Sequence, residues 1–209
     1  MTRSPAIDRR RRALAFAALA GLAGTPLLPR TARAATAGGV DFAEQIKLGP
    51  HALVLNGAGI RYKTVFKVYA AGLYLTQKSS SAEDVLAAPQ AKRMHMVLLR
   101  DIDADDIGKL FVRGLQENMP KGVSAQLVPS ILRVSQVFSE YRRLHEGDTI
   151  ISDWVPGTGT VVTVRGQSTG APIPEPAFYR AFLSIWLGAK PADWTLKDQL
   201  LGKSPNAAA

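Results

Sequence analysis

Apolar runs and strand-forming residues alternate with short polar segments along this 209-residue chain. The apolar runs are rich in valine, isoleucine, leucine and tyrosine, which favour extended structure. We expect strands over residues 52–62, 65–76, 92–99, 148–155 and 160–165. The Pro-Gly-Thr-Gly sequence between the last two is typical of a turn, so these two strands are expected to follow each other directly.

A helical pattern occupies the middle and the end of the chain. Apolar positions three and four apart predict a helix over residues 103–119, with Asp103 at its N-cap. The same spacing over residues 127–141 predicts a second helix that ends near Gly147, with Pro129 in its first turn. Shorter helices are expected over residues 81–88, 177–187 and 194–201.

The succession of strands, helices, strands and helices predicts an α+β fold with a long antiparallel sheet, rather than repeated βαβ units. Residues 36–39 are interpreted as a linker and residues 204–209 as a frayed tail. Residues 35–209 are numerous enough for one domain with a full core. A single domain is therefore expected after residue 34.

The first 34 residues have the three-part form of a secretory signal peptide. An arginine-rich start precedes an apolar run from Ala13 to Gly24, and Ala32-Arg33-Ala34 forms a cleavage motif. The run is shorter than the roughly 20 residues that a membrane span needs. Arg11-Arg12 fits twin-arginine export, and the general secretory route stays open. We therefore expect a periplasmic or secreted protein that begins at Ala35, with no membrane span.

Charge and composition exclude several functions. The chain is formally +9, but the first 34 residues carry seven arginines against one aspartate, so the remainder is only +3. That remainder has no nucleic-acid footprint. Cysteine is absent, which excludes disulfides and thiolate chemistry. His51, His95 and His145 have no metal-ligand spacing, so no metal and no cofactor is predicted.

Two apparent motifs have simpler explanations. Gly57-Ala58-Gly59 is followed by a strand and not by a helix, which favours a bulge or close backbone approach over a phosphate loop. The acidic run from Asp101 to Asp106 lacks the glycine and glutamate of a calcium loop. It suits the start of a helix instead.

Arg61 and Tyr69 are the strongest candidates for a site. If the two strands that contain them form a hairpin turning near residues 63–65, they lie opposite or nearly opposite each other on one face, and a bulge would shift this pairing. An arginine beside a phenol among aliphatic residues can hold a carboxylate or an enolate. An exposed cross-strand pair is the alternative. Asn118 shares a helical face with Phe111 and needs a partner, either in a site or as a helix cap.

Four segments of the chain resemble the chalcone isomerase superfamily, and most closely its bacterial, exported, chalcone-isomerase-like branch. They are GAGIR-x-x-x-x-FKVYAAGLYL, FVRGLQEN, DWVPGTGTVV and IPEPAFYRAFLSIWLG. The resemblance extends over about residues 42–202. It implies an open-faced β-sandwich in which helices cover a long antiparallel sheet, with a ligand cleft between them.

The resemblance also implies roles for the candidate residues. Arg61 matches the arginine that polarises the substrate in the plant enzymes, and Asn118 matches their site asparagine. Tyr69 stands where those enzymes have a threonine, and Phe111 where they have a tyrosine. In the fatty-acid-binding members an arginine and a tyrosine on these strands hold the carboxylate. These departures favour binding over catalysis.

Three functions follow from this resemblance. The first is an exported binding protein for fatty acids or similar apolar carboxylates, with Arg61, Tyr69, Phe111 and Asn118 at the ligand. The second is an isomerase of the chalcone isomerase type, an intramolecular lyase using Arg61, Tyr69 and Asn118. The third is a non-catalytic envelope interaction protein with a vestigial cleft. The sequence leaves ligand length and oligomeric state open.

The signal-peptide pattern predicts the N-terminus of the exported protein. We expect N-terminal sequencing of protein recovered from outside the cytosol to begin at Ala35, because the cleavage motif ends at Ala34. An intact Met1 on cytosolic protein would contradict this prediction.

Overall fold

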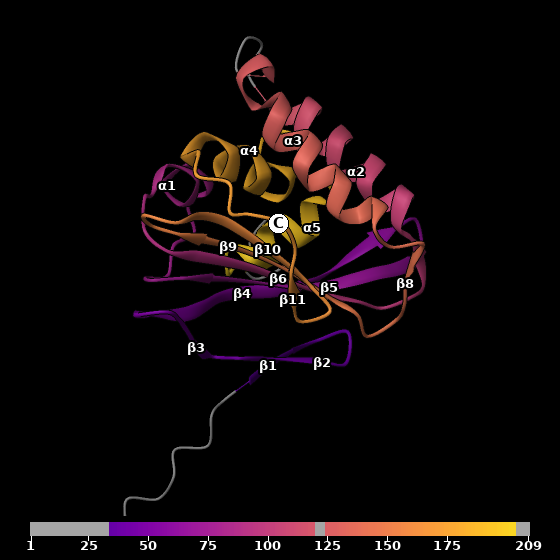
Figure 1. Ribbon diagram of the computed structural model, residues 1–209. Coiled ribbons are helices and arrows are strands. Elements are labelled where there is room, and N and C mark those ends of the chain that lie inside the picture. The colour runs from indigo at the N-terminus through magenta and orange to yellow at the C-terminus, as the bar shows by residue number, and fades with distance from the viewer. Residues whose placement is uncertain (1–33, 120–123, 204–209) are drawn as a thin grey trace, which may run out of the picture. The chain divides into compact units, whose positions relative to one another are not determined.

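The computed structural model describes residues 34–119 and 124–203, which form an α+β fold on one long antiparallel sheet (Figure 1). This confirms the predicted fold class. The expected signal peptide, apart from Ala34, and the expected tail over residues 204–209 lie outside the described residues.

The main sheet has seven strands in the order β11-β10-β9-β6-β5-β4-β3, and each pairs antiparallel with its neighbours. Two short pairs, β1 with β2 and β7 with β8, lie outside it. The sheet strands are β3 (Gln45–Leu48), β4 (His51–Lys63), β5 (Phe66–Leu75), β6 (Lys92–Leu98), β9 (Thr149–Val155), β10 (Gly159–Val164) and β11 (Gln167–Ser168). The short pairs are β1 (Ala34–Ala37), β2 (Val40–Ala43), β7 (Ile102–Asp103) and β8 (Arg143–Leu144).

The helices pack on one face of the sheet, and the β1–β2 ribbon lies against the other (Figure 1). Side chains from all five helices share one hydrophobic core with that face of the sheet. The helices are α1 (Ala82–Ala87), α2 (Ala104–Asn118), α3 (Ser124–Ser139), α4 (Pro176–Leu187) and α5 (Trp194–Leu200).

The predicted linker over residues 36–39 is wrong. Residues 34–37 form β1, and the chain turns at Gly38 and Gly39, whose φ angles of 63° and 86° suit glycine. The ribbon forms because Phe42 on β2 is fully buried against β5. At Gly72 an added Cβ would lie 2.6 Å from the Phe42 ring, so glycine makes room for it.

The second long helix also differs from its prediction. It begins at Ser124, so Pro129 lies in its second turn and not in its first. It ends at Ser139 and not near Gly147, because the following residues turn into β8 and pair with β7. Apolar spacing alone continues past this end, since Leu144 is buried as well, but on a strand.

Helix α5 lies directly on the second half of β4, where the edge of β4 away from β5 has no strand neighbour among the described residues. A Cβ on Gly57 would overlap the backbone carbonyl of Gln199, so glycine admits the helix. The Gln199 side chain accepts a hydrogen bond from the Ile60 N–H at 3.2 Å, and Asp193 accepts one from the Tyr62 N–H at 3.0 Å. The helix therefore covers a strand edge that would otherwise stay open.

This contact explains the Gly-x-Gly sequence and gives a stability prediction. Gly57→Ala should lower the free energy of unfolding by about 1–3 kcal/mol, because the methyl group meets backbone that cannot rotate away. Gly108→Ala is the matched control. Gly108 lies within α2, and an added Cβ there would approach Phe138 only to 3.9 Å. This substitution should raise the free energy of unfolding by about 0.5–1 kcal/mol. Urea titration of both variants checks this, and equal effects would contradict it.

Candidate functional site

A β-bulge at Asn56 decides which face of the sheet Arg61 occupies. Leu55 pairs with Tyr74, but Gly57 already pairs with the next residue of β5, so Asn56 is an extra residue in β4. An extra residue moves every later side chain to the opposite face. Before the bulge, Leu55 belongs to the core between the sheet and the β1–β2 ribbon. After the bulge, Arg61 points to the helix-covered face of the sheet.

The amide side chain of Asn56 holds this bulge in place. It donates to the carbonyls of Ser79 and Leu200 at 2.9 and 2.7 Å, and it accepts from the Ser79 N–H at 2.7 Å. Asn56 is buried, so these bonds satisfy groups that water does not reach. They also tie the bulge to the end of α5.

The predicted register of the hairpin is confirmed, because Arg61 and Tyr69 are direct cross-strand partners. A second bulge follows on β5, where Val68 is the extra residue between the partners of Arg61 and Tyr62. As a result Val68 and Tyr69, although adjacent in sequence, both belong to the core on the helix side.

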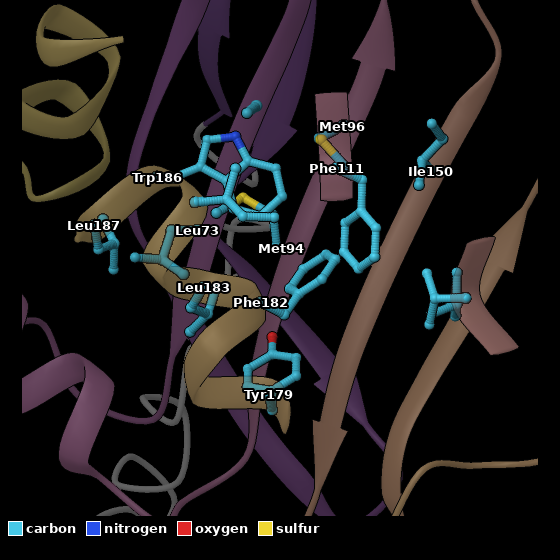
Figure 2. Packing of buried hydrophobic residues seen from close by; sticks show 14 of the residues in the cluster. Leu73, Met94, Met96, Phe111, Ile150, Tyr179, Phe182, Leu183, Trp186 and Leu187 are labelled. Carbon is cyan, nitrogen blue, oxygen red and sulfur yellow. The ribbon is translucent and has the colours of Figure 1, made fainter. Parts of the chain in front are cut away.

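A cavity of about 360 Å³ lies between the sheet and helices α2, α3 and α4, within the range of small-molecule sites. Most of its lining is apolar, and Figure 2 shows the rings of Phe111 and Phe182 approaching each other, with Met96 and Ile150 nearby. The ring centroids of Phe111 and Phe182 are 5.7 Å apart. The apolar lining includes Met96, Phe111, Val134, Phe138, Ile150 and Phe182.

Arg61 supplies a positive charge at this cavity. Its Nε–H is buried and has no hydrogen-bond partner among the described residues. Its guanidinium carbon lies 5.6 Å from the centre of the Tyr69 ring, and within the described part of the chain it forms no ion pair. Burying a donor without an acceptor costs free energy. Because the Nε–H of Arg61 lies beside a cavity, an acceptor on a bound molecule would remove that cost.

Tyr69 presents a donor beside this charge. The indole N–H of Trp186 donates to the Tyr69 oxygen at 2.7 Å, which leaves the phenolic hydrogen available for another acceptor. Burial raises the pKa of the Tyr69 phenol, whereas the Arg61 charge and the Trp186 hydrogen bond act in the opposite direction. Because the pKa is raised overall, Tyr69 is protonated at neutral pH.

Trp186 is a site residue that sequence reasoning missed. It lies on α4, lines the cavity and is 117 residues from its partner in sequence. A buried tryptophan needs an acceptor for its N–H, and that rule was the available signal. Helical spacing places it with Phe182 but gives no indication of which strand residue it meets.

Phe111 and Asn118 have different positions with respect to the cavity. Phe111 lines it. The Asn118 side chain is not part of the lining among the described residues. It accepts from the Lys190 N–H at 2.8 Å and donates to the carbonyls of Lys190 and Gly114 at 2.8 and 2.9 Å. The structure thus places Asn118 as a clamp between α2 and the α4–α5 loop.

The mouth of the cavity is charged. Lys63, Arg113 and Glu117 are the exposed members of its lining. Arg113 and Glu117 pair with each other at 2.8 Å, one turn apart on α2. The acidic group at the mouth is therefore already partnered. Inside, Arg61 has a free donor, and the Tyr69 hydroxyl, whose oxygen accepts from Trp186, has a hydrogen to donate.

The model of the chalcone isomerase-like family matches residues 34–202, and the chain belongs to this family. Among solved structures, it is similar to the crystal structure of an Arabidopsis thaliana fatty-acid binding protein, with a TM-score of 0.64 and 17% identity. The match covers 78% of this chain and 92% of that one, and at this identity it shows a shared fold. A search of curated protein sequences finds no match.

The hydrogen bonds of Asn118 predict a structural role. Asn118→Ala should lower the free energy of unfolding by about 1–2 kcal/mol, since it removes three hydrogen bonds to partly exposed backbone. Gln116→Ala, at an exposed position of the same helix, is the control and should change stability by less than about 0.5 kcal/mol. Thermal denaturation compares the two, and an unchanged Asn118→Ala protein would rule out the clamp.

Proposed function

We propose that this protein is an exported binding protein for a fatty acid or similar apolar carboxylate. The carboxylate accepts hydrogen bonds from Arg61 and Tyr69, and the hydrocarbon chain occupies the apolar cavity. The observation that carries this proposal is the buried, unpartnered Nε–H of Arg61 beside that cavity.

The polarity of the site supports an anionic head group. Arg61 and Tyr69 each have a hydrogen to donate within it, and the one carboxylate of its lining is paired with Arg113. An arginine fork binds a carboxylate through charge-assisted bonds, and the neutral Tyr69 hydroxyl adds a further donor. An anion therefore satisfies the groups that the protein leaves without partners.

The apolar lining supports a hydrocarbon body. Each methylene moved from water into such a cavity contributes about 0.8 kcal/mol. Aromatic and branched side chains from the sheet and three helices provide the surface. The similar Arabidopsis structure is that of a protein titled as fatty-acid binding, which agrees with this ligand class.

The alternatives make less use of the same features. An envelope interaction protein with a vestigial cleft has no need of a cavity of about 360 Å³ with an unpartnered arginine. An isomerase needs proton-organising donors around the enolate, and Phe111 offers none. Its ring instead lies 6.3 Å from that of Phe138, in a purely apolar contact.

Two substitutions at the head group test the binding site. Arg61→Ala should weaken binding of a fluorescent fatty acid by about 10- to 150-fold, because it removes a charge-assisted bond. Tyr69→Phe should cost only about fivefold, since it removes one neutral donor and keeps the ring. Arg133→Ala is the control, at an exposed arginine on α3 outside the cavity. Unchanged affinity in Arg61→Ala would place the head group elsewhere.

A chalcone assay separates binding from catalysis. Cyclisation requires stabilisation of an enolate, for which one well-placed donor is worth roughly 3–4 kcal/mol. Because Phe111 stands where the plant enzymes have a tyrosine and cannot donate, we expect no turnover beyond a weak residual rate. Absorbance of a chalcone substrate with the purified protein gives the measurement. A rate far above the spontaneous one and abolished by Arg61→Ala would make this protein an enzyme.

A further inference from the structure

The tip of the β4–β5 hairpin exposes large apolar side chains. Tyr62, Val65 and Phe66 are 41%, 76% and 61% exposed, and they follow one another around a two-residue turn. Trp194, at the first turn of α5, is 62% exposed. It lies nearby, because the preceding residue, Asp193, accepts the hydrogen bond from the Tyr62 N–H. Clustered apolar groups on a surface mark an interaction site, whereas single ones are ordinary.

The turn itself is not built from the residues that make turns easily. Lys63 pairs with Phe66, so Thr64 and Val65 form the loop, and Thr64 has a φ of 58°. That conformation favours glycine or asparagine and is unusual for a β-branched residue. The hairpin thus presents an apolar tip where a polar, flexible turn would be the ordinary solution.

Cations surround these apolar groups. Lys63, Lys67 and Arg100 are exposed, and in the described part of the chain none pairs with an acidic group. Arg100 lies over the Phe66 ring, 5.4 Å from its centre. We call the surface formed by Tyr62, Lys63, Val65, Phe66, Lys67 and Arg100 the hairpin patch. Lys197 has the same relation to the neighbouring Trp194, at 5.1 Å.

The hairpin patch borders the mouth of the cavity. Lys63 belongs to both, because it ends β4 at the tip and also lines the cavity. Two residues earlier, Arg61 lies at the proposed head-group position. The site and the patch are therefore neighbouring parts of one hairpin.

We propose that the hairpin patch docks on the surface of an anionic lipid bilayer, where the cavity exchanges its fatty acid. This inference rests on the proposed function. Apolar and aromatic side chains enter the boundary between head groups and acyl chains, while lysine and arginine pair with anionic head groups. The hairpin patch combines exposed apolar side chains with lysine and arginine, which is the composition that such docking requires. Among the described residues no helix is long and apolar enough to cross a bilayer.

Co-sedimentation with vesicles tests the docking. The purified protein is mixed with vesicles of phosphatidylcholine or of equimolar phosphatidylcholine and phosphatidylglycerol. We expect binding to the anionic vesicles that weakens with added salt. Val65→Ser with Phe66→Ser should weaken it by more than about tenfold, since both apolar groups are lost. Lys67→Glu with Arg100→Glu should weaken it by about 25-fold or more, at about fivefold for each basic side chain.

Matched controls come from other surfaces of the same protein. Val128→Ser with Leu132→Ser removes two apolar side chains on α3 that are 47% and 58% exposed. Lys47→Glu with Lys78→Glu reverses two exposed charges at the opposite end of the hairpin. Neither control pair should change vesicle binding. Equal losses in patch and control variants, or equal binding to neutral and anionic vesicles, would overturn the proposal.

A second measurement separates this inference from the proposed function. Affinity for free fluorescent fatty acid, without vesicles, should be unchanged in Val65→Ser with Phe66→Ser, because neither residue lines the cavity. The rate at which the protein takes the same fatty acid from anionic vesicles should be lower in this double variant, in parallel with its weaker vesicle binding. Normal binding of free ligand with no vesicle binding refutes the docking alone. Vesicle binding without any affinity for free ligand supports the docking and refutes the proposed function.

One other result would assign the hairpin patch to a different partner. A protein that does not bind vesicles but sediments as a dimer, and becomes a monomer with Val65→Ser and Phe66→Ser, would show that a second copy covers the patch. That result also overturns the docking proposal.

Discussion

The hydrogen bonds of the Asn56 side chain hold the geometry on which the rest of the site depends. They fix one extra residue in β4 and join it to the loop after β5 and to the end of α5. Without that extra residue Arg61 would point to the face of the sheet that the β1–β2 ribbon covers, and not toward the helices. Because the carbonyl of Leu200 is buried in this contact, the same amide that aims the arginine also seats the helix over Gly57. Bulges commonly serve to redirect a side chain in this way.

The cavity has two unlike ends because different elements supply them. The apolar part comes from helices α2, α3 and α4 packed over the centre of the sheet, where β5 is covered on both faces. The polar part comes from the end of β4, where the cover is thin and Arg61 is only half-buried. Trp186 connects the two, with its ring in the apolar wall and its N–H on the Tyr69 oxygen. A charge without a partner lowers stability, and proteins retain such groups where function requires them.

The β4–β5 hairpin also changes character along its length. Near the middle of the sheet, Leu73 and Tyr74 are buried on opposite faces by helices and ribbon. Toward the tip the cover ends, and the same strands expose apolar and cationic side chains to solvent. The site lies at the boundary between these two zones. The cavity thus passes from a charged surface to an apolar interior within a few residues of the same hairpin.

The sequence by itself determined the long strands, the helices and the main candidate pair. Runs of strand-forming residues and helical spacing identified these elements, because both patterns depend on neighbours within one element. The eight-residue spacing of Arg61 and Tyr69 predicted that they lie opposite or nearly opposite each other across a short turn, and the bulge at Val68 makes them direct partners. The family resemblance could also be recognised from local segments of the sequence. It agrees with the match of the family model over residues 34–202.

Only the tertiary structure decided the remaining features, and each depends on groups far apart in sequence. Asn118 meets Lys190 across 72 residues, and Trp186 meets Tyr69 across 117. The β1–β2 ribbon forms where Phe42 packs against Gly72. A segment whose sequence predicts a linker is therefore part of a strand pair. Hydrophobic periodicity records which face of an element is buried. It carries no information about which distant donor, acceptor or ring will lie against that face, and packing of the whole chain determines that choice.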